Sequence, residues 1–119
     1  IVVVNRYHDA PAATAFIKGF GLQKGALASS VAHDSHNIVA VGTNDESLCA
    51  VVNAVIAAKG GLAACSSAAD VLLLPLPVAG LMSTADAWQV AHQYTALNAA
   101  AKALGTPLAA PFMTLSFMA

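Results

Sequence analysis

The chain has 119 residues, of which 58% are hydrophobic and only 9% are charged, and its formal net charge is −1. This length supports one domain with a real hydrophobic core and is too short for two. The five basic residues are scattered and form no patch for a phosphate backbone, which argues against nucleic-acid binding. Since ordinary soluble domains carry roughly 25% charged residues, we expect another domain or subunit to cover part of this surface. An alanine-rich genome is the alternative explanation.

The sequence also argues against a membrane or secreted protein. A spanning helix needs about 18 consecutive apolar residues, and the most apolar window, residues 71–82, is shorter and contains two prolines. No signal peptide is predicted. Cys49 and Cys65 lie apart in apolar contexts, which favours buried free thiols in a reducing cytoplasm. The chain starts at Ile1 and stops at Ala119 next to apolar segments, and we expect both ends to be cuts through a longer protein.

The first third of the chain is predicted to form β-strands. Residues 1–4 are β-branched and residues 15–20 are a short candidate strand, while residues 27–32 and 37–41 are two further candidates. The polar residues 33–36 lie between the last two. This pair is therefore predicted to form a hairpin with its histidines at the tip.

A helix followed by two strands is predicted next. Thr43 and Glu46 have the spacing of a capping box, with Thr43 as the N-cap, and apolar residues at helical spacing continue to the glycines at 60–61. Residues 62–65 and 71–76 are then predicted to be strands. The prolines of the second strand place it near a sheet edge or at its end.

A second helix completes the predicted fold. Ser83 is its predicted N-cap, an apolar stripe runs from residue 87 to residue 104, and Gly105 and Pro107 end it. Residues 112–118 are apolar and are either a last strand or a segment that docks elsewhere. This order predicts an α+β fold, with a mostly antiparallel or mixed β-sheet and two main helices packed on one face.

One polar cluster stands out in this apolar chain: His33, Asp34, Ser35, His36 and Asn37. Polar groups in a buried setting must be hydrogen-bonded or meet a partner. Four explanations remain open: a metal site, nucleophilic catalysis by Ser35, contact with another domain, and a self-satisfied turn. No other His or Cys has ligand spacing, and adjacent residues rarely reach the geometry of a catalytic triad, so contact with another domain is favoured. No metal or cofactor site is predicted within the chain.

Several segments together carry a resemblance to a known family. They are residues 16–22 (FIKGFGL), 24–26, 28–38 (ASSVAHDSHNI), 41–45 (VGTND), 60–62, 74–83 (LPLPVAGLMS) and 111–117 (PFMTLSF). Their order and spacing resemble the C-terminal domain of bacterial adenine deaminases, which belong to the amidohydrolase superfamily. The resemblance spans nearly the whole chain, so residues 1–119 are expected to be this domain alone.

The resemblance implies a function for the complete protein. It is expected to be a cytoplasmic, metal-dependent hydrolase of purine metabolism, acting on a cyclic amidine and converting adenine to hypoxanthine and ammonia. The family's catalytic domain is an upstream TIM barrel, in which manganese or iron activates a water molecule. The barrel ligands include a His-x-His element, which this chain lacks. The chain itself is therefore expected to hold no metal and to be inactive alone.

Three roles for the chain are considered. In the first, the domain packs on its own barrel and its turn, His33, Asp34, Ser35, His36 and Asn37, contacts the active site that binds adenine. In the second, it is a structural or oligomerisation domain of a homo-oligomer and takes no direct part in catalysis. In the third, it is a small independent metal-binding module.

Overall fold

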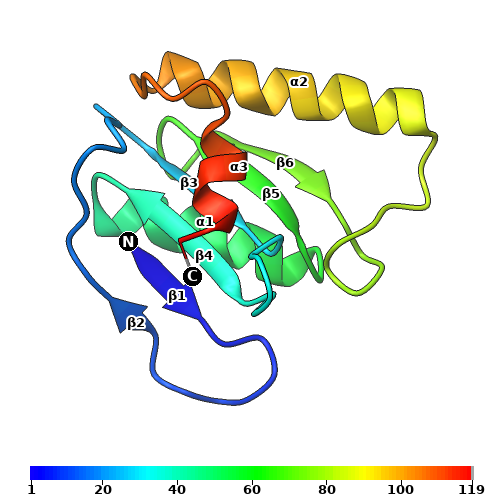
Figure 1. The fold of residues 1–119 in the computed structure, drawn as a ribbon, viewed down its shortest axis with the longest axis horizontal. Helices are drawn as coiled ribbons and strands as arrows, with labels where there is room; N and C mark the ends of the chain where they lie inside the picture. The colour runs from blue at the N-terminus through cyan, green and yellow to red at the C-terminus, as the bar shows by residue number, and fades with distance from the viewer. Residues whose placement is uncertain (119) are drawn as a thin grey trace.

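The computed structural model describes residues 1–118 and shows a six-stranded antiparallel sheet in the order β2-β1-β4-β3-β5-β6, covered by helices (Figure 1). The strands are β1 (Val2–Val4), β2 (Ala13–Thr14), β3 (Ala26–Ser29), β4 (Ile38–Gly42), β5 (Gly61–Cys65) and β6 (Val71–Pro75), and the helices are α1 (Asp45–Ala57), α2 (Ala87–Ala103) and α3 (Pro111–Ser116). Within residues 1–118, no helix combines the length and apolarity that crossing a bilayer requires.

The central hairpin is confirmed. β3 and β4 pair antiparallel, with Leu27 opposite Val41 and Ser29 opposite Val39, and residues 33–36 lie in the connection between them. The pair β5 and β6 is also confirmed. β6 is an edge strand that ends at Pro75, a position where a residue without a backbone N–H is tolerated.

The α+β class is confirmed, but the prediction that both main helices share one face of the sheet is wrong. α1 packs on the face that presents the alanines of β3, β4 and β5, whereas α2 and α3 pack on the opposite face (Figure 1). The reason is that β3 and β5 are buried along their whole length. A strand that is apolar on both sides needs a covering layer on each.

The two faces differ in the size of their side chains. On β3, Ala26 and Ala28 point toward α1, and Leu27 points toward α2 and α3. Ala40 and Ala63 continue the small-residue face on the neighbouring strands. Small side chains let α1 lie close to the sheet, and the larger residues opposite fill the space under two helices.

The helix starts differ from the predicted ones. Asn44, not Thr43, is the N-cap of α1, because its Oδ1 accepts a hydrogen bond from Ser47 N at 2.9 Å. Thr43 Oγ1 instead donates to the Gly25 carbonyl. Asp86, not Ser83, caps α2. These shifts of one to three residues leave both helices in place.

Three further predictions are corrected. Residues 15–20 form no strand, and the short strand of this region is β2. The strand considered at 112–118 is the helix α3, which begins at Pro111, where the missing N–H breaks no helical bond. Both cysteines are free; Cys65 is buried as predicted, but Cys49 is exposed.

Candidate functional site

The polar turn at residues 33–37 is anchored by main-chain hydrogen bonds. His33 N donates to the carbonyl of Ser116 in α3 at 2.6 Å, and His36 N donates to the Ala32 carbonyl at 2.8 Å. Asn37 N donates to Ser35 Oγ at 3.3 Å. The turn is thus fixed both to itself and to the end of α3, so its tip is presented by a rigid support.

The tip of this turn is strained. Asp34 and His36 have φ angles of 66° and 50°, in the left-handed region that costs a residue other than glycine about 1–2 kcal/mol. The Nδ1 atom of His36 is buried and has no hydrogen-bond partner among residues 1–118. Left-handed φ angles are common at Asp and His in turns, whereas a buried side-chain nitrogen without a partner among the described residues is uncommon and calls for an explanation.

His33 and Asp34 form the exposed part of the turn. Their side chains are 64% and 92% exposed, and Nε2 of His33 lies 3.9 Å from Oδ1 of Asp34, an arrangement that contributes little in water. The His33 ring also lies 5.0 Å from the ring of Phe117, which is itself exposed. An imidazole and a phenyl ring therefore stand together on the surface beside a carboxylate.

Arg6 joins this site from the end of β1, and sequence reasoning missed it. Its backbone N donates to Asn37 Oδ1 at 3.4 Å, and its Nη2 donates to the Ala79 carbonyl at 2.9 Å. A Cβ on Gly80 would come within 2.1 Å of Arg6 Nη1, so the guanidinium lies flat on that glycine. Arg6 thus connects the turn to the loop at 78–82.

Ser30 makes the second connection to that loop. Its Oγ donates to the Gly80 carbonyl at 2.5 Å and accepts from Gly61 N at 2.8 Å, fully inside the protein. The signal available in the sequence was the pair Ser29 and Ser30 in an apolar run shortly before the polar turn. Together Arg6 and Ser30 gather the turn, the 78–82 loop and the start of β5 at one end of the sheet.

Comparison with known proteins identifies the family. A sequence model described as the adenine deaminase C-terminal domain matches residues 1–119.

The chain belongs to the adenine deaminase C-terminal domain family.

Curated relatives agree with this assignment. The chain is 55% identical over 118 residues to an adenine deaminase of Methanosarcina mazei. The matched stretch covers 99% of the chain and 21% of the relative. It is 54% identical over 120 residues to an adenine deaminase of Salinibacter ruber, and 52% identical over 120 residues to one of Sulfurovum. These two matches each cover 22% of the relative. This domain therefore spans about a fifth of the length of the relatives it matches.

Among residues 1–118, the groups around the turn match neither a metal centre nor a serine nucleophile. Among residues 1–118, no three His, Cys, Asp or Glu side chains lie close enough together to hold a metal ion. The hydroxyl of Ser35 accepts a hydrogen bond from Asn37 N and makes none to either neighbouring histidine in the described part of the chain.

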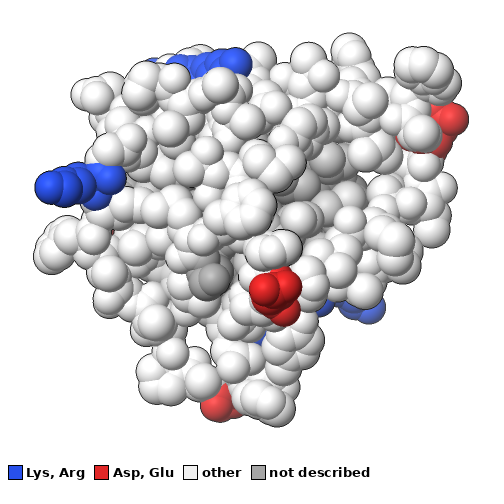
Figure 2. All heavy atoms as spheres, in the orientation of Figure 1, with Lys and Arg blue, Asp and Glu red and all other residues white. Residues whose placement is uncertain are grey.

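The surface of the domain is poor in charge and rich in exposed apolar side chains. Figure 2 shows one face on which charged side chains are few and widely separated. Large apolar residues are exposed in several parts of the chain: Tyr7, Phe16, Met82, Trp88 and Phe117. Such a surface is typical of a domain that is covered in its working state.

Proposed function

We propose that this chain is the accessory domain of an adenine deaminase that hydrolyses adenine to hypoxanthine and ammonia in cytoplasmic purine metabolism. The names of the relatives support the activity. The observation that carries the role of this domain is His36, a strained residue with a buried, unpaired Nδ1 at the tip of an anchored turn. A buried polar atom without a partner calls for an explanation, and a shift of the turn on contact with another domain would bring His36 Nδ1 to a partner.

The turn is proposed to contact the active site of a TIM barrel that precedes this domain in the complete protein. There, the side chains of residues 33–37 would hydrogen-bond the purine or the groups that hold it, and the anchored backbone would keep them in place. The barrel would hold manganese or iron. Because the metal would belong to the barrel, the 119-residue chain alone is expected to turn over no adenine.

Replacing His36 with alanine in the complete protein tests this role. If the imidazole contacts the substrate or its immediate surroundings, kcat/KM for adenine falls about 10- to 100-fold. The matched control is His92→Ala, because His92 is an exposed residue of α2, and this variant should keep the activity of the parent protein. The thermal unfolding temperature of each variant shows whether a loss of activity comes from a lost contact or from a destabilised fold. Unchanged kcat/KM at an unchanged unfolding temperature would show that the turn has no part in the reaction.

A second candidate function is that of an oligomerisation domain, and the apolar surface near α2 favours it. Trp88 is 85% exposed, and an apolar groove lined by Leu74, Met82, Val90 and Tyr94 lies between α2 and β6. A second copy of the protein could cover this groove in a homo-oligomer. Sedimentation of the complete protein tests it: a monomer at working concentrations would rule it out.

A further inference from the structure

The pairing of β1 with its neighbours continues to the first residue of the chain. Ile1 lies one residue before the bounds of β1, yet it exchanges two hydrogen bonds with Ala15. Its N donates to the Ala15 carbonyl at 2.8 Å, and its carbonyl accepts from Ala15 N at 3.0 Å. On the other side of β1, Val2 lies opposite Ala40, so the same register puts Ile1 opposite Val41. The start of β1 therefore lies beside the end of β4 (Figure 1).

The end of β4 presents backbone groups to the residue that directly precedes Ile1, which we call the entry residue. Along an antiparallel strand, the N–H and C=O groups of successive residues point to opposite sides. Thr43 N donates to the Gly25 carbonyl, on the β3 side of β4. The N–H and C=O of Gly42 therefore point the other way, toward β1. In the register of β1 and β4, the residue opposite Gly42 is the entry residue.

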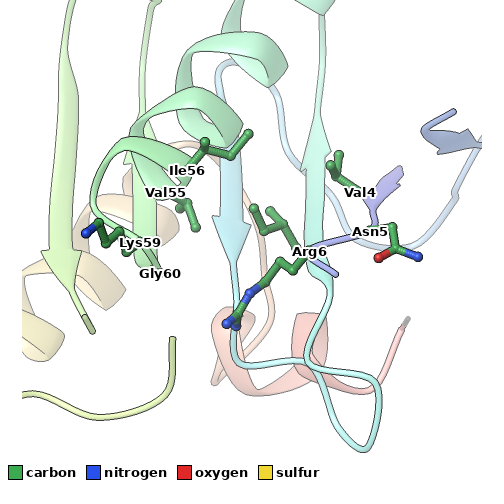
Figure 3. Close-up of a pocket in the computed structure, with 8 residues that line it drawn as sticks. Val4, Asn5, Arg6, Val55, Ile56, Lys59 and Gly60 are labelled. Atoms are coloured by element: carbon green, nitrogen blue, oxygen red, sulfur yellow. The ribbon is translucent and has the colours of Figure 1, made fainter. Parts of the chain in front are cut away.

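The side chain of the entry residue would point toward α1. At the other end of β1, Val4 shares a hollow with Val55 and Ile56 of α1 (Figure 3). Side chains alternate between the two faces of a strand. Val2 and the entry residue, which lie two and four positions before Val4, therefore belong to this same face.

A second hollow, of about 450 Å³, lies at this place near the N-terminal end of α1, and Gly42, Leu48 and Phe16 are among the residues that line it. A Cβ on Gly42 would come within 2.8 Å of Leu48 Cγ, so Leu48 packs directly on the glycine and gives the hollow an apolar floor. Phe16 is fully exposed. Since Val2 pairs with Thr14, the same register places Phe16 opposite the entry residue. An apolar side chain there would cover both Leu48 and Phe16.

We propose that the segment directly preceding Ile1 in the complete protein extends β1, so that the entry residue exchanges two hydrogen bonds with Gly42 and packs an apolar side chain on Leu48 and Phe16. The proposal rests on the proposed place of this domain at the end of a longer adenine deaminase, since the chain matches about a fifth of its relatives. β1 lies between β2 and β4, so its extension is held on both sides. The preceding domain is then joined to this one by a paired strand instead of a flexible linker, which limits how far the turn at residues 33–37 can move from the barrel.

Disulfide formation in the complete protein tests this register. Cysteine replaces the entry residue in a Phe16→Cys variant, with Cys49→Ser to remove an exposed thiol. Because Ile1 and Ala15 form a hydrogen-bonded pair, the next pair is a non-hydrogen-bonded one, whose Cα atoms lie about 4.5 Å apart. A disulfide can bridge that distance. After mild oxidation, peptide mass spectrometry is expected to find this bond within one chain.

The matched control moves the upstream cysteine one residue further from Ile1 and keeps Phe16→Cys. A shift of one residue turns the side chain to the opposite face of the sheet, so the disulfide yield should be at least about tenfold lower. Hydrogen exchange of the unmodified complete protein gives an independent measurement that depends on no variant. The Gly42 amide is expected to exchange at least about tenfold more slowly than its intrinsic rate, because the entry residue accepts its hydrogen bond.

Three results would overturn the proposal: a Gly42 amide that exchanges at its intrinsic rate, equal disulfide yields (including none) in the two cysteine pairs, or a disulfide that joins only different chains. The kinetics of His36→Ala separate this proposal from the proposed function. If His36→Ala lowers kcat/KM while the cysteine pair stays reduced, the extension of β1 is wrong and the proposed function stands. If the disulfide forms while His36→Ala keeps the parent kinetics, the extension stands and the role of the turn is wrong.

Discussion

Replacing Gly60 with alanine is expected to lower the free energy of unfolding of the domain by about 3 kcal/mol or more. Gly60 has a φ of +127°, outside the conformations that residues with a side chain adopt at low cost. The added Cβ would lie 2.3 Å from the Cα of Gly80 and 2.9 Å from the carbonyl oxygen of Leu76. Both are backbone atoms, so the strain is relieved only by moving Leu76 and the 78–82 loop away from the end of α1.

Urea denaturation of the 119-residue chain measures this effect, with Gly19→Ala as the matched control. Gly19 also has a positive φ, +85°, but its added Cβ would meet nothing within 4 Å, so its cost should be only about 1–2 kcal/mol from the backbone conformation. Equal losses for the two variants would mean that the close approach of Gly60 to Gly80 contributes nothing. In the complete protein, Gly60→Ala should also disturb the position of the turn at residues 33–37. Ser30 and Arg6, which lie beside the turn, both donate hydrogen bonds to carbonyls of the 78–82 loop.

Removing the aromatic ring of Phe112 is expected to cost about 3–5 kcal/mol of stability. Phe112 is 2% exposed and belongs to the larger of the two hydrophobic clusters. It lies in α3, whose Ser116 carbonyl accepts the hydrogen bond from His33 N. Phe112→Ala therefore opens a cavity under the helix that anchors the polar turn.

The neighbouring residue supplies the control for this variant. Met113 is 56% exposed, so Met113→Ala should change the free energy of unfolding by no more than about 0.5 kcal/mol. Urea denaturation compares the two, and hydrogen exchange at the His33 amide should increase in Phe112→Ala but not in Met113→Ala. Unchanged hydrogen exchange at the His33 amide in a destabilised Phe112→Ala variant would show that α3 does not hold the turn.

The strands and main helices could be predicted because their patterns are local. The hairpin of β3 and β4 follows from two apolar runs around a polar turn, and α1 follows from helical spacing between a polar cap and Gly60. α3 was missed because a short apolar run fits a helix as well as a strand. The prediction of which face of the sheet each helix covers was wrong. That choice depends on the alternation of small and large residues, such as Ala26 and Leu27, within fully buried strands.

The candidate site was only partly predictable. The cluster around His36 was visible because polar residues interrupt an apolar sequence. Its strain was not visible, since a φ angle is a property of the folded backbone. Arg6 is 31 residues from Asn37 along the chain, and no local pattern indicates that pairing. The closeness of Gly60 and Gly80 likewise arises only when two separate loops meet at one end of the sheet.

A crystal structure of the complete protein with adenine bound is the most direct test of the proposed role of the turn at residues 33–37. We expect the ring of His36 to contact the purine or a group that holds it, with its Nδ1 atom hydrogen-bonded to an atom from outside this domain. A structure in which the turn faces solvent, or lies at a subunit boundary away from the purine, would contradict that role.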